Sequence, residues 1–188
     1  MYDDFYWMNQ FGDPGYRYHI LMSKLWGVLA LRLANAEILP FDFAFYADNI
    51  RQFIAELQLN KYAKQHFDFK PLLDRVSQFE VEGRALNQAI DRVLASGNIN
   101  HTLSQPINRR IMQVEANWLN PAGIPGRPWF KHTLYAARYT YAHLELPGLT
   151  EAVEVQNWDE AQRQAEILGQ AIDTNTALMR RMEKELQQ

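Results

Sequence analysis

Histidine is the residue type best suited to metal binding and proton transfer near neutral pH, and the chain has five of them. No two have the spacing that places a pair of metal ligands on one helix face, and no HExxH pattern of zinc peptidases occurs. We interpret all five as surface or hydrogen-bonded structural residues and expect no metal site in this chain. They are His19, His66, His101, His132 and His143.

Other catalytic patterns are also missing from the sequence. The four serines lie in no GxSxG elbow, no glycine-rich phosphate loop is present, and the chain has no cysteine. Two carboxylate pairs, Glu80 with Glu82 and Glu151 with Glu154, fit solvated helix faces better than an acid–base pair. By itself, the sequence shows no complete active site.

Length and composition indicate one folded domain of ordinary chemistry. A chain of 188 residues with 47% apolar residues is globular rather than disordered. The net charge of −3 argues against a nucleic-acid partner, which requires a basic face. The most apolar run, residues 20–31, is interrupted by Lys24 and is shorter than the ~20 residues that span a bilayer, so we expect no membrane segment.

Residues 117–132 form the one long stretch that cannot be helical. Its three prolines lack a backbone N–H, and its two glycines favour turns. Large apolar side chains are interleaved with these breakers, which predicts an ordered, packed crossover rather than a linker. They are Trp118, Leu119, Ile124, Trp129 and Phe130.

Helical periodicity dominates the remainder of the chain. It predicts helices over residues 13–36, 43–62, 68–96, 104–118 and from 157 to near the C-terminus. The first is apolar nearly all round, which predicts a buried central helix. The last carries one apolar stripe in which Asn175 is positioned to set register or partner choice.

The sequence therefore predicts an all-α fold. We expect a single domain over 1–188, built as an up-down bundle of four to five long helices. The crossover, rich in proline, glycine and aromatic residues, precedes the last helix.

The crossover and the first helix resemble the C-terminal helical domain of the transferrin receptor and glutamate carboxypeptidase II family, called the transferrin-receptor-like dimerisation domain. The resemblance covers almost the whole chain, and the proline–glycine stretch is its most specific part. The similar segments, in order, are Leu31–Ala36, Leu39–Asp42, Asn120–His132, Leu134–Ala136 and Leu146–Gly148.

This resemblance implies that the domain follows a two-zinc aminopeptidase-like domain, whose last zinc ligand falls just before Met1. Zinc is then expected only in that missing upstream domain, and no cofactor in this chain. Residues 2–11 look like the end of a helix that begins earlier, which agrees with a domain excised from a larger zinc-peptidase-like protein. The resemblance also implies that the longer protein acts outside the cytoplasm, as a periplasmic, secreted or cell-surface protein.

One functional feature carries over by resemblance. In glutamate carboxypeptidases, a Lys-Tyr pair on the crossover loop enters the substrate pocket and holds the terminal glutamate. Here Thr140 and Tyr141 occupy those positions, so the hydroxyl is kept while the lysine is lost. Arg138 is close enough in sequence to substitute for the lysine.

Three functions are compatible with the sequence. The leading hypothesis is a homodimerisation domain of a glutamate-carboxypeptidase-like zinc exopeptidase, with itself and the upstream peptidase-like domain as partners and no catalysis of its own. The alternative is the same domain in a non-catalytic, transferrin-receptor-like binding protein. A third hypothesis is a freestanding enzyme that uses Tyr141 with His132 or His143.

Overall fold

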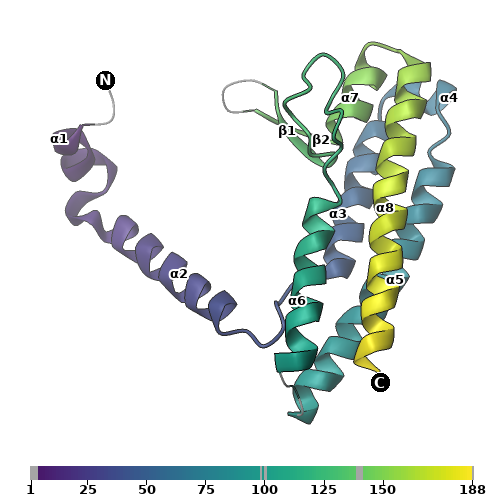
Figure 1. Cartoon of the computed structure of the whole chain (residues 1–188). Coiled ribbons are helices and arrows are strands. Elements are labelled where there is room, and N and C mark those ends of the chain that lie inside the picture. Colours follow the sequence, from purple (N-terminus) through teal and green to yellow (C-terminus); the bar gives the residue numbers. More distant parts are fainter. Residues whose placement is uncertain (1–3, 98, 100, 139–141, 188) are drawn as a thin grey trace. The chain divides into compact units, whose positions relative to one another are not determined.

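The computed structural model describes residues 4–97, 99, 101–138 and 142–187 (Figure 1). The chain separates into two compact units, residues 1–40 and 41–188, where the sequence predicted a single domain. The difference arises at residues 35–42, which form a loop between the first long helix and the rest of the chain.

The first unit contains a short helix α1 (Phe5–Trp7), a π-turn (Met8–Gly12), a 3-10 turn (Pro14–Tyr16) and the long helix α2 (Arg17–Ala34). No residue of α2 is buried, so the prediction of a buried central helix is wrong. A helix with apolar side chains on every face needs cover from several sides, and a 40-residue unit whose other helices are single turns cannot supply it.

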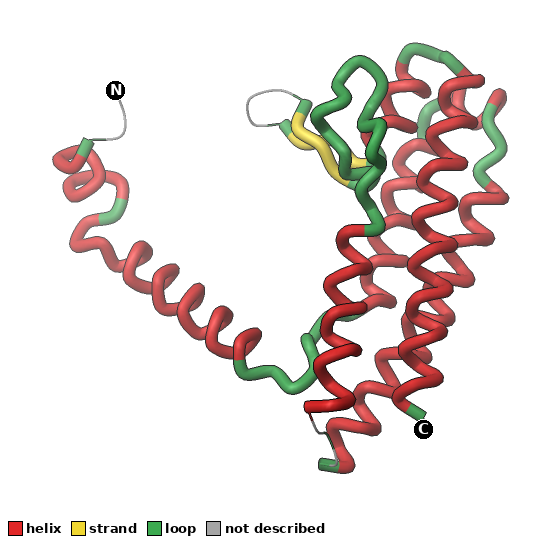
Figure 2. Tube along the Cα trace, viewed as in Figure 1, coloured by secondary structure: helices red, strands yellow, loops and turns green. Residues whose placement is uncertain are grey.

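The second unit is a helical bundle, which confirms the predicted fold class (Figure 2). Its four long helices are α3 (Phe43–Gln58), α5 (Lys70–Ser96), α6 (His101–Ala116) and α8 (Trp158–Leu186), and the short helices α4 (Lys61–His66) and α7 (Pro147–Glu154) complete it. Polar side chains cap the N-termini of three of the helices: Asp42 accepts from the Ala44 and Phe45 amides, Asn60 from the Tyr62 and Ala63 amides, and Asn157 from the Glu160 amide.

The bundle core lies where α5 meets α3 and α8. The predicted seam of α5 is buried from Leu72 to Ile90, and Gly83 sets the closest approach to α3. A Cβ at Gly83 would lie 3.1 Å from backbone atoms of Phe43 and Ala44. The helices can pack at this distance only because the glycine has no side chain.

Asn175 is fully buried within the apolar stripe of α8. Its amide nitrogen donates to the Val114 carbonyl oxygen over 3.1 Å, and its oxygen accepts from Asn117 over 2.7 Å. Because both partners belong to the same chain, Asn175 fixes the register of α8 against α6 and against Asn117, which follows the end of α6.

The segment between the crossover and α7 forms a small antiparallel sheet, where the sequence analysis predicted no strand. Strand β1 (Tyr135–Ala137) pairs with β2 (His143–Glu145), with Ala136 opposite Leu144. Within the part of the chain that the structure describes, no helix combines the length and apolarity needed to cross a membrane.

Candidate functional site

The crossover is an ordered loop pinned by its own backbone, as the sequence predicted. The Asn120 amide donates to the Lys131 carbonyl over 2.8 Å, and the Ile124 amide donates to the Phe130 carbonyl over 3.0 Å. Trp118 is fully buried beneath the loop and stacks on Tyr46. These bonds replace the helical hydrogen bonds that the prolines remove.

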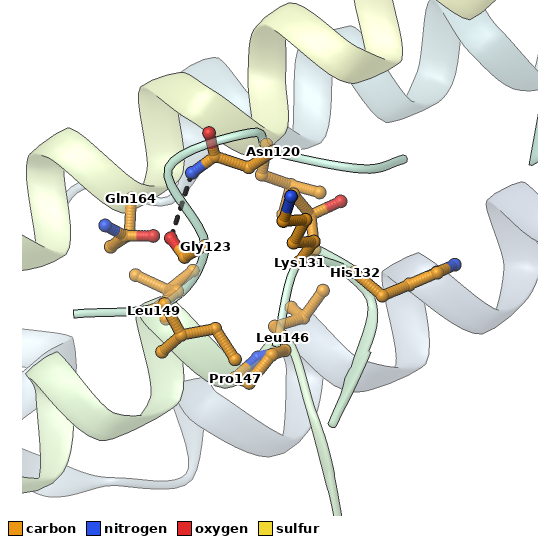
Figure 3. Close-up of a pocket in the computed structure, with 12 residues that line it drawn as sticks. Asn120, Gly123, Lys131, His132, Leu146, Pro147, Leu149 and Gln164 are labelled. Atoms are coloured by element: carbon orange, nitrogen blue, oxygen red, sulfur yellow. Dashed lines mark hydrogen bonds between the residues drawn. The ribbon is translucent and has the colours of Figure 1, made fainter. Parts of the chain in front are cut away.

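Gly123 makes the tight turn of the crossover possible. Its φ of +72° lies in the left-handed region, and a Cβ there would lie 2.3 Å from the Pro128 carbonyl oxygen. The Asn120 side chain donates to the Gly123 carbonyl over 3.1 Å, as the dashed line in Figure 3 shows.

Two arginines tie the crossover and the β1–β2 hairpin to α7. Arg127 donates to the Ala137 carbonyl oxygen at the end of β1 over 2.5 Å and also pairs with Glu151. Arg138, which directly follows Ala137, pairs with Glu154 through both of its terminal nitrogens. Since Glu151 and Glu154 lie three residues apart on one face of α7, the base of the hairpin is held at two points.

The paired carboxylates lie at the surface of the helices, and each of them also forms an ion pair that the sequence spacing did not predict. Besides Glu151 and Glu154, Glu80 accepts from Arg51 of α3 and from Arg84 of its own helix. Glu82 accepts from Arg180 of α8. The sequence spacing alone could not show this, because each of these four carboxylates has a partner at least 16 residues away in the sequence.

His132 links the crossover to the bundle. Its Nδ1 atom accepts from the Leu134 and Tyr135 amides over 3.2 and 3.3 Å, so the ring proton lies on Nε2, which donates to Glu115 over 3.0 Å. The other carboxylate oxygen of Glu115 accepts from the Tyr46 hydroxyl over 3.0 Å. Both nitrogens of His132 are thus engaged, which leaves neither to serve as a general base.

Tyr46 remains a hydrogen-bond donor throughout the physiological pH range. Burial of its phenol, together with the nearby Glu115 carboxylate, raises the pKa of Tyr46 to about 12. Tyr46, Glu115 and His132 therefore form a persistent polar bridge between α3, α6 and the crossover, which we call the Glu115 bridge.

The crossover, α7 and α8 enclose a small cavity (Figure 3). Its volume of about 10 Å³ is the space of a single water molecule, far below the ~300 Å³ or more of ligand pockets. Asn120, Lys131 and Gln164 are among the residues that line it. This cavity is too small for a peptide substrate.

A larger hollow surface lies between α3 and α6, and no sequence pattern predicted it. One hollow of about 490 Å³ is lined by Phe41, Phe43, Tyr46, Ile111, Met112, Val114 and Glu115. A neighbouring hollow of about 250 Å³, lined by Phe45, Tyr46, Asn49, Ile50, Glu115, Leu134 and Tyr135, shares Tyr46 and Glu115 with it. We call the two together the α3–α6 groove.

The predicted pocket-loop residues are only partly described. Thr140 and Tyr141 lie outside the described residues. Arg138 is held by Glu154, and His143 has an exposed ring 3.6 Å from Glu145. In the described ranges, no three histidines, aspartates or glutamates come together as a metal site would require.

Comparison with known proteins identifies the fold family. Residues 67–180, more than half of the chain, match the family described as "Transferrin receptor-like dimerisation domain". The chain belongs to this family. The match confirms the resemblance derived from the proline–glycine crossover and the flanking helices.

The relatives of this dimerisation domain are much longer proteins. The chain is 28% identical over 181 residues to the probable glutamate carboxypeptidase LAMP1 of Arabidopsis thaliana, covering 92% of the chain and 26% of that protein. It is 32% identical over 158 residues to the probable glutamate carboxypeptidase VP8 of Zea mays, covering 80% of the chain and 22% of that protein. An "inactive zinc metalloprotease" of Schizosaccharomyces pombe is 24% identical over 175 residues, covering 89% of the chain and 22% of that protein. The chain thus spans about a quarter of the length of the curated relatives it matches.

Proposed function

We propose that this chain is the homodimerisation domain of a longer, glutamate-carboxypeptidase-like zinc metallopeptidase, and that its β1–β2 hairpin contributes to that protein's substrate pocket. The family match supports the dimerisation role, and the names of LAMP1 and VP8 support the kind of longer protein. The observation that carries the pocket role is the double tie of Arg127 and Arg138 to α7, because a loop that orients a substrate must start from a fixed base.

Light scattering after size-exclusion chromatography tests the dimerisation role. We expect a particle of about twice the 22.0 kDa of one chain. A permanent homodimer of this kind buries on the order of 2,000 Å² or more in total and persists at low micromolar concentration. A strict monomer at tens of micromolar would contradict self-association by this domain.

Tyr141 is the residue through which the pocket role is tested. In the longer protein, Tyr141→Phe removes the one hydroxyl proposed to donate a hydrogen bond to the substrate, and we expect KM to rise by about tenfold. Tyr62→Phe, at an exposed position on α4, serves as the matched control and should leave KM unchanged. Equal KM values for the Tyr141 variant and the unaltered protein would remove Tyr141 from the pocket.

The exposed apolar side chains of helix α2 indicate a second partner. We propose that this partner is the peptidase-like domain that precedes this one in the longer protein. Leu21, Leu25 and Trp26 are each at least 58% exposed, and contiguous apolar surface of this kind normally marks a contact. Hydrogen exchange of the α2 amides should be fast in this chain and slow in the longer protein. Equal exchange rates in the two would exclude the contact.

The alternative is that the longer protein is a non-catalytic binding protein. One relative is named as an inactive zinc metalloprotease, which supports this alternative. The gene segment before Met1 decides between the two: paired His, Asp and Glu zinc ligands support the peptidase, and their loss supports the binding protein.

A freestanding enzyme has less support, because both ring nitrogens of His132 are engaged. We expect no peptidase activity from this chain with added zinc. Hydrolysis that Tyr141→Phe abolishes would revive that hypothesis.

A further inference from the structure

The α3–α6 groove has the chemistry of an interface core. Of the side chains that line its two hollows, only Glu115 is charged, and both of its oxygens are already paired, one with Tyr46 and one with His132. A partner that covers the groove therefore need not strip water from an unpaired charge, which is the main cost of burying polar surface. Aromatic residues and methionine, which make up much of its lining, are the residue types enriched in interface cores.

The groove carries protrusions as well as hollows. Phe45 of α3 is 63% exposed and lines the smaller hollow, and Met112 of α6 is 56% exposed and lines the larger one. In a two-fold symmetric dimer the same patch must supply both the protruding side chain and the hollow that receives it. The α3–α6 groove therefore has both of the features that a two-fold interface requires.

The size of the patch also suits a dimer. Phe41 and Tyr135, 41% and 46% exposed, extend the apolar surface that Phe45 and Met112 begin. At ~200 Å² for a large side chain, the exposed parts of the four amount to about 400 Å². One partner of a permanent homodimer contributes about 1,000 Å², roughly two thirds of it apolar, so the groove supplies somewhat more than half of the apolar share.

We infer that the α3–α6 groove is the surface through which two copies of this chain associate, with Phe45 and Met112 of each copy entering the hollows of the other. The inference rests on the proposed dimerisation function and specifies the face that performs it. The net charge of −3 adds a reason for this location, since two like-charged chains associate best through a face that presents no unpaired charge.

Sedimentation equilibrium of the full 188-residue chain tests whether the α3–α6 groove is the contact face. Two double variants and one single variant are compared with the unaltered chain. Phe45→Glu with Met112→Glu places charges in the groove. Val81→Glu, at a 65% exposed position on α5 that lines neither hollow, is the matched control. Leu25→Glu with Trp26→Glu removes apolar association through α2, whose side chains are comparably exposed.

We expect the groove variant to weaken the dimer by about 100-fold or more and the Val81 and α2 variants to change Kd by less than about threefold. All the altered side chains are exposed, so circular dichroism should show the same helix content in each variant. A dimer that resists the groove variant, or that dissociates only with the α2 variant, overturns the groove as the contact face while dimerisation stands. A monomeric unaltered chain overturns both the groove and the dimerisation role.

Discussion

Helices α2 and α8 are both long and rich in apolar residues, yet they behave in opposite ways. Helix α8 confines its apolar residues to one stripe, from Ala161 to Leu186, and buries that stripe in the bundle. Helix α2 spreads them round its circumference and buries none. The comparison shows that the arrangement of apolar residues, rather than their number, decides whether a helix completes its own domain or requires a neighbour.

Removing one apolar side chain from each helix should affect the stability of the protein very differently. Ile172→Ala in α8, at a fully buried position, should lower the free energy of unfolding by about 2–5 kcal/mol because it leaves a cavity. Leu25→Ala in α2, at a position 58% exposed, should change it by less than about 0.5 kcal/mol. Urea unfolding followed by circular dichroism measures both values, and equal losses would show that α2 belongs to the same cooperative core.

Much of the bundle was predictable from the sequence because its signals are local. The four-and-three spacing of α5 and the stripe of α8 depend only on neighbouring residues, and both seams are buried as expected. The crossover was predictable for the same reason, since Pro121 and Gly123 restrict their own backbone. The error over α2 arose because periodicity shows which faces are apolar but not where the covering protein comes from.

The candidate site was less predictable because its contacts are long-range. Glu115 meets Tyr46 across 69 residues, and Glu82 meets Arg180 across 98 residues. No spacing rule connects such pairs, so the groove and the ion pairs emerged only from the structure. Arg127 is 24 residues from Glu151, and its place within the crossover gave no sign of its role in anchoring the hairpin.

A second test compares polar side chains on the two helices. Asn175→Ala in α8 leaves the Val114 carbonyl and the Asn117 amide without their buried partner, and should cost about 1–3 kcal/mol of unfolding free energy. Ser23 of α2 is exposed and donates only to the His19 carbonyl of its own helix, so Ser23→Ala should be nearly neutral. Asn175→Ala with unchanged stability would show that the register of α8 does not depend on this residue.

A third test uses two mid-helix glycines. Gly83→Ala in α5 forces a Cβ to within 3.1 Å of the α3 backbone, and should destabilise the bundle by about 1–2 kcal/mol despite the better helix propensity of alanine. Gly27→Ala in α2 meets no atom within 4 Å, so propensity alone acts and should stabilise α2 by up to about 1 kcal/mol. Helix content by circular dichroism and urea midpoints should therefore move in opposite directions, and parallel shifts would contradict the close contact at Gly83.

The smallest expected effect is a difference in acid sensitivity between the bundle and α2. Hydrogen bonds from Arg84 and then Arg51 hold the pKa of Glu80 below its usual value of 4.5. A carboxyl whose pKa is lower in the folded state stabilises the fold fully above its unfolded pKa, and this contribution is lost as pH falls through the folded pKa. We therefore compare the unfolding free energies of the unaltered chain and Glu80→Gln. Their difference should be about 0.5 kcal/mol, as for other exposed ion pairs. It should be constant above about pH 6 and shrink below about pH 4.5. Helix α2 contains no aspartate or glutamate, but the Asp13 carboxylate accepts from the Tyr18 and His19 amides at its start. Acid should therefore unwind only the first turn of α2, and a loss of helix content along the whole of α2 in this range would indicate that it unfolds together with the bundle.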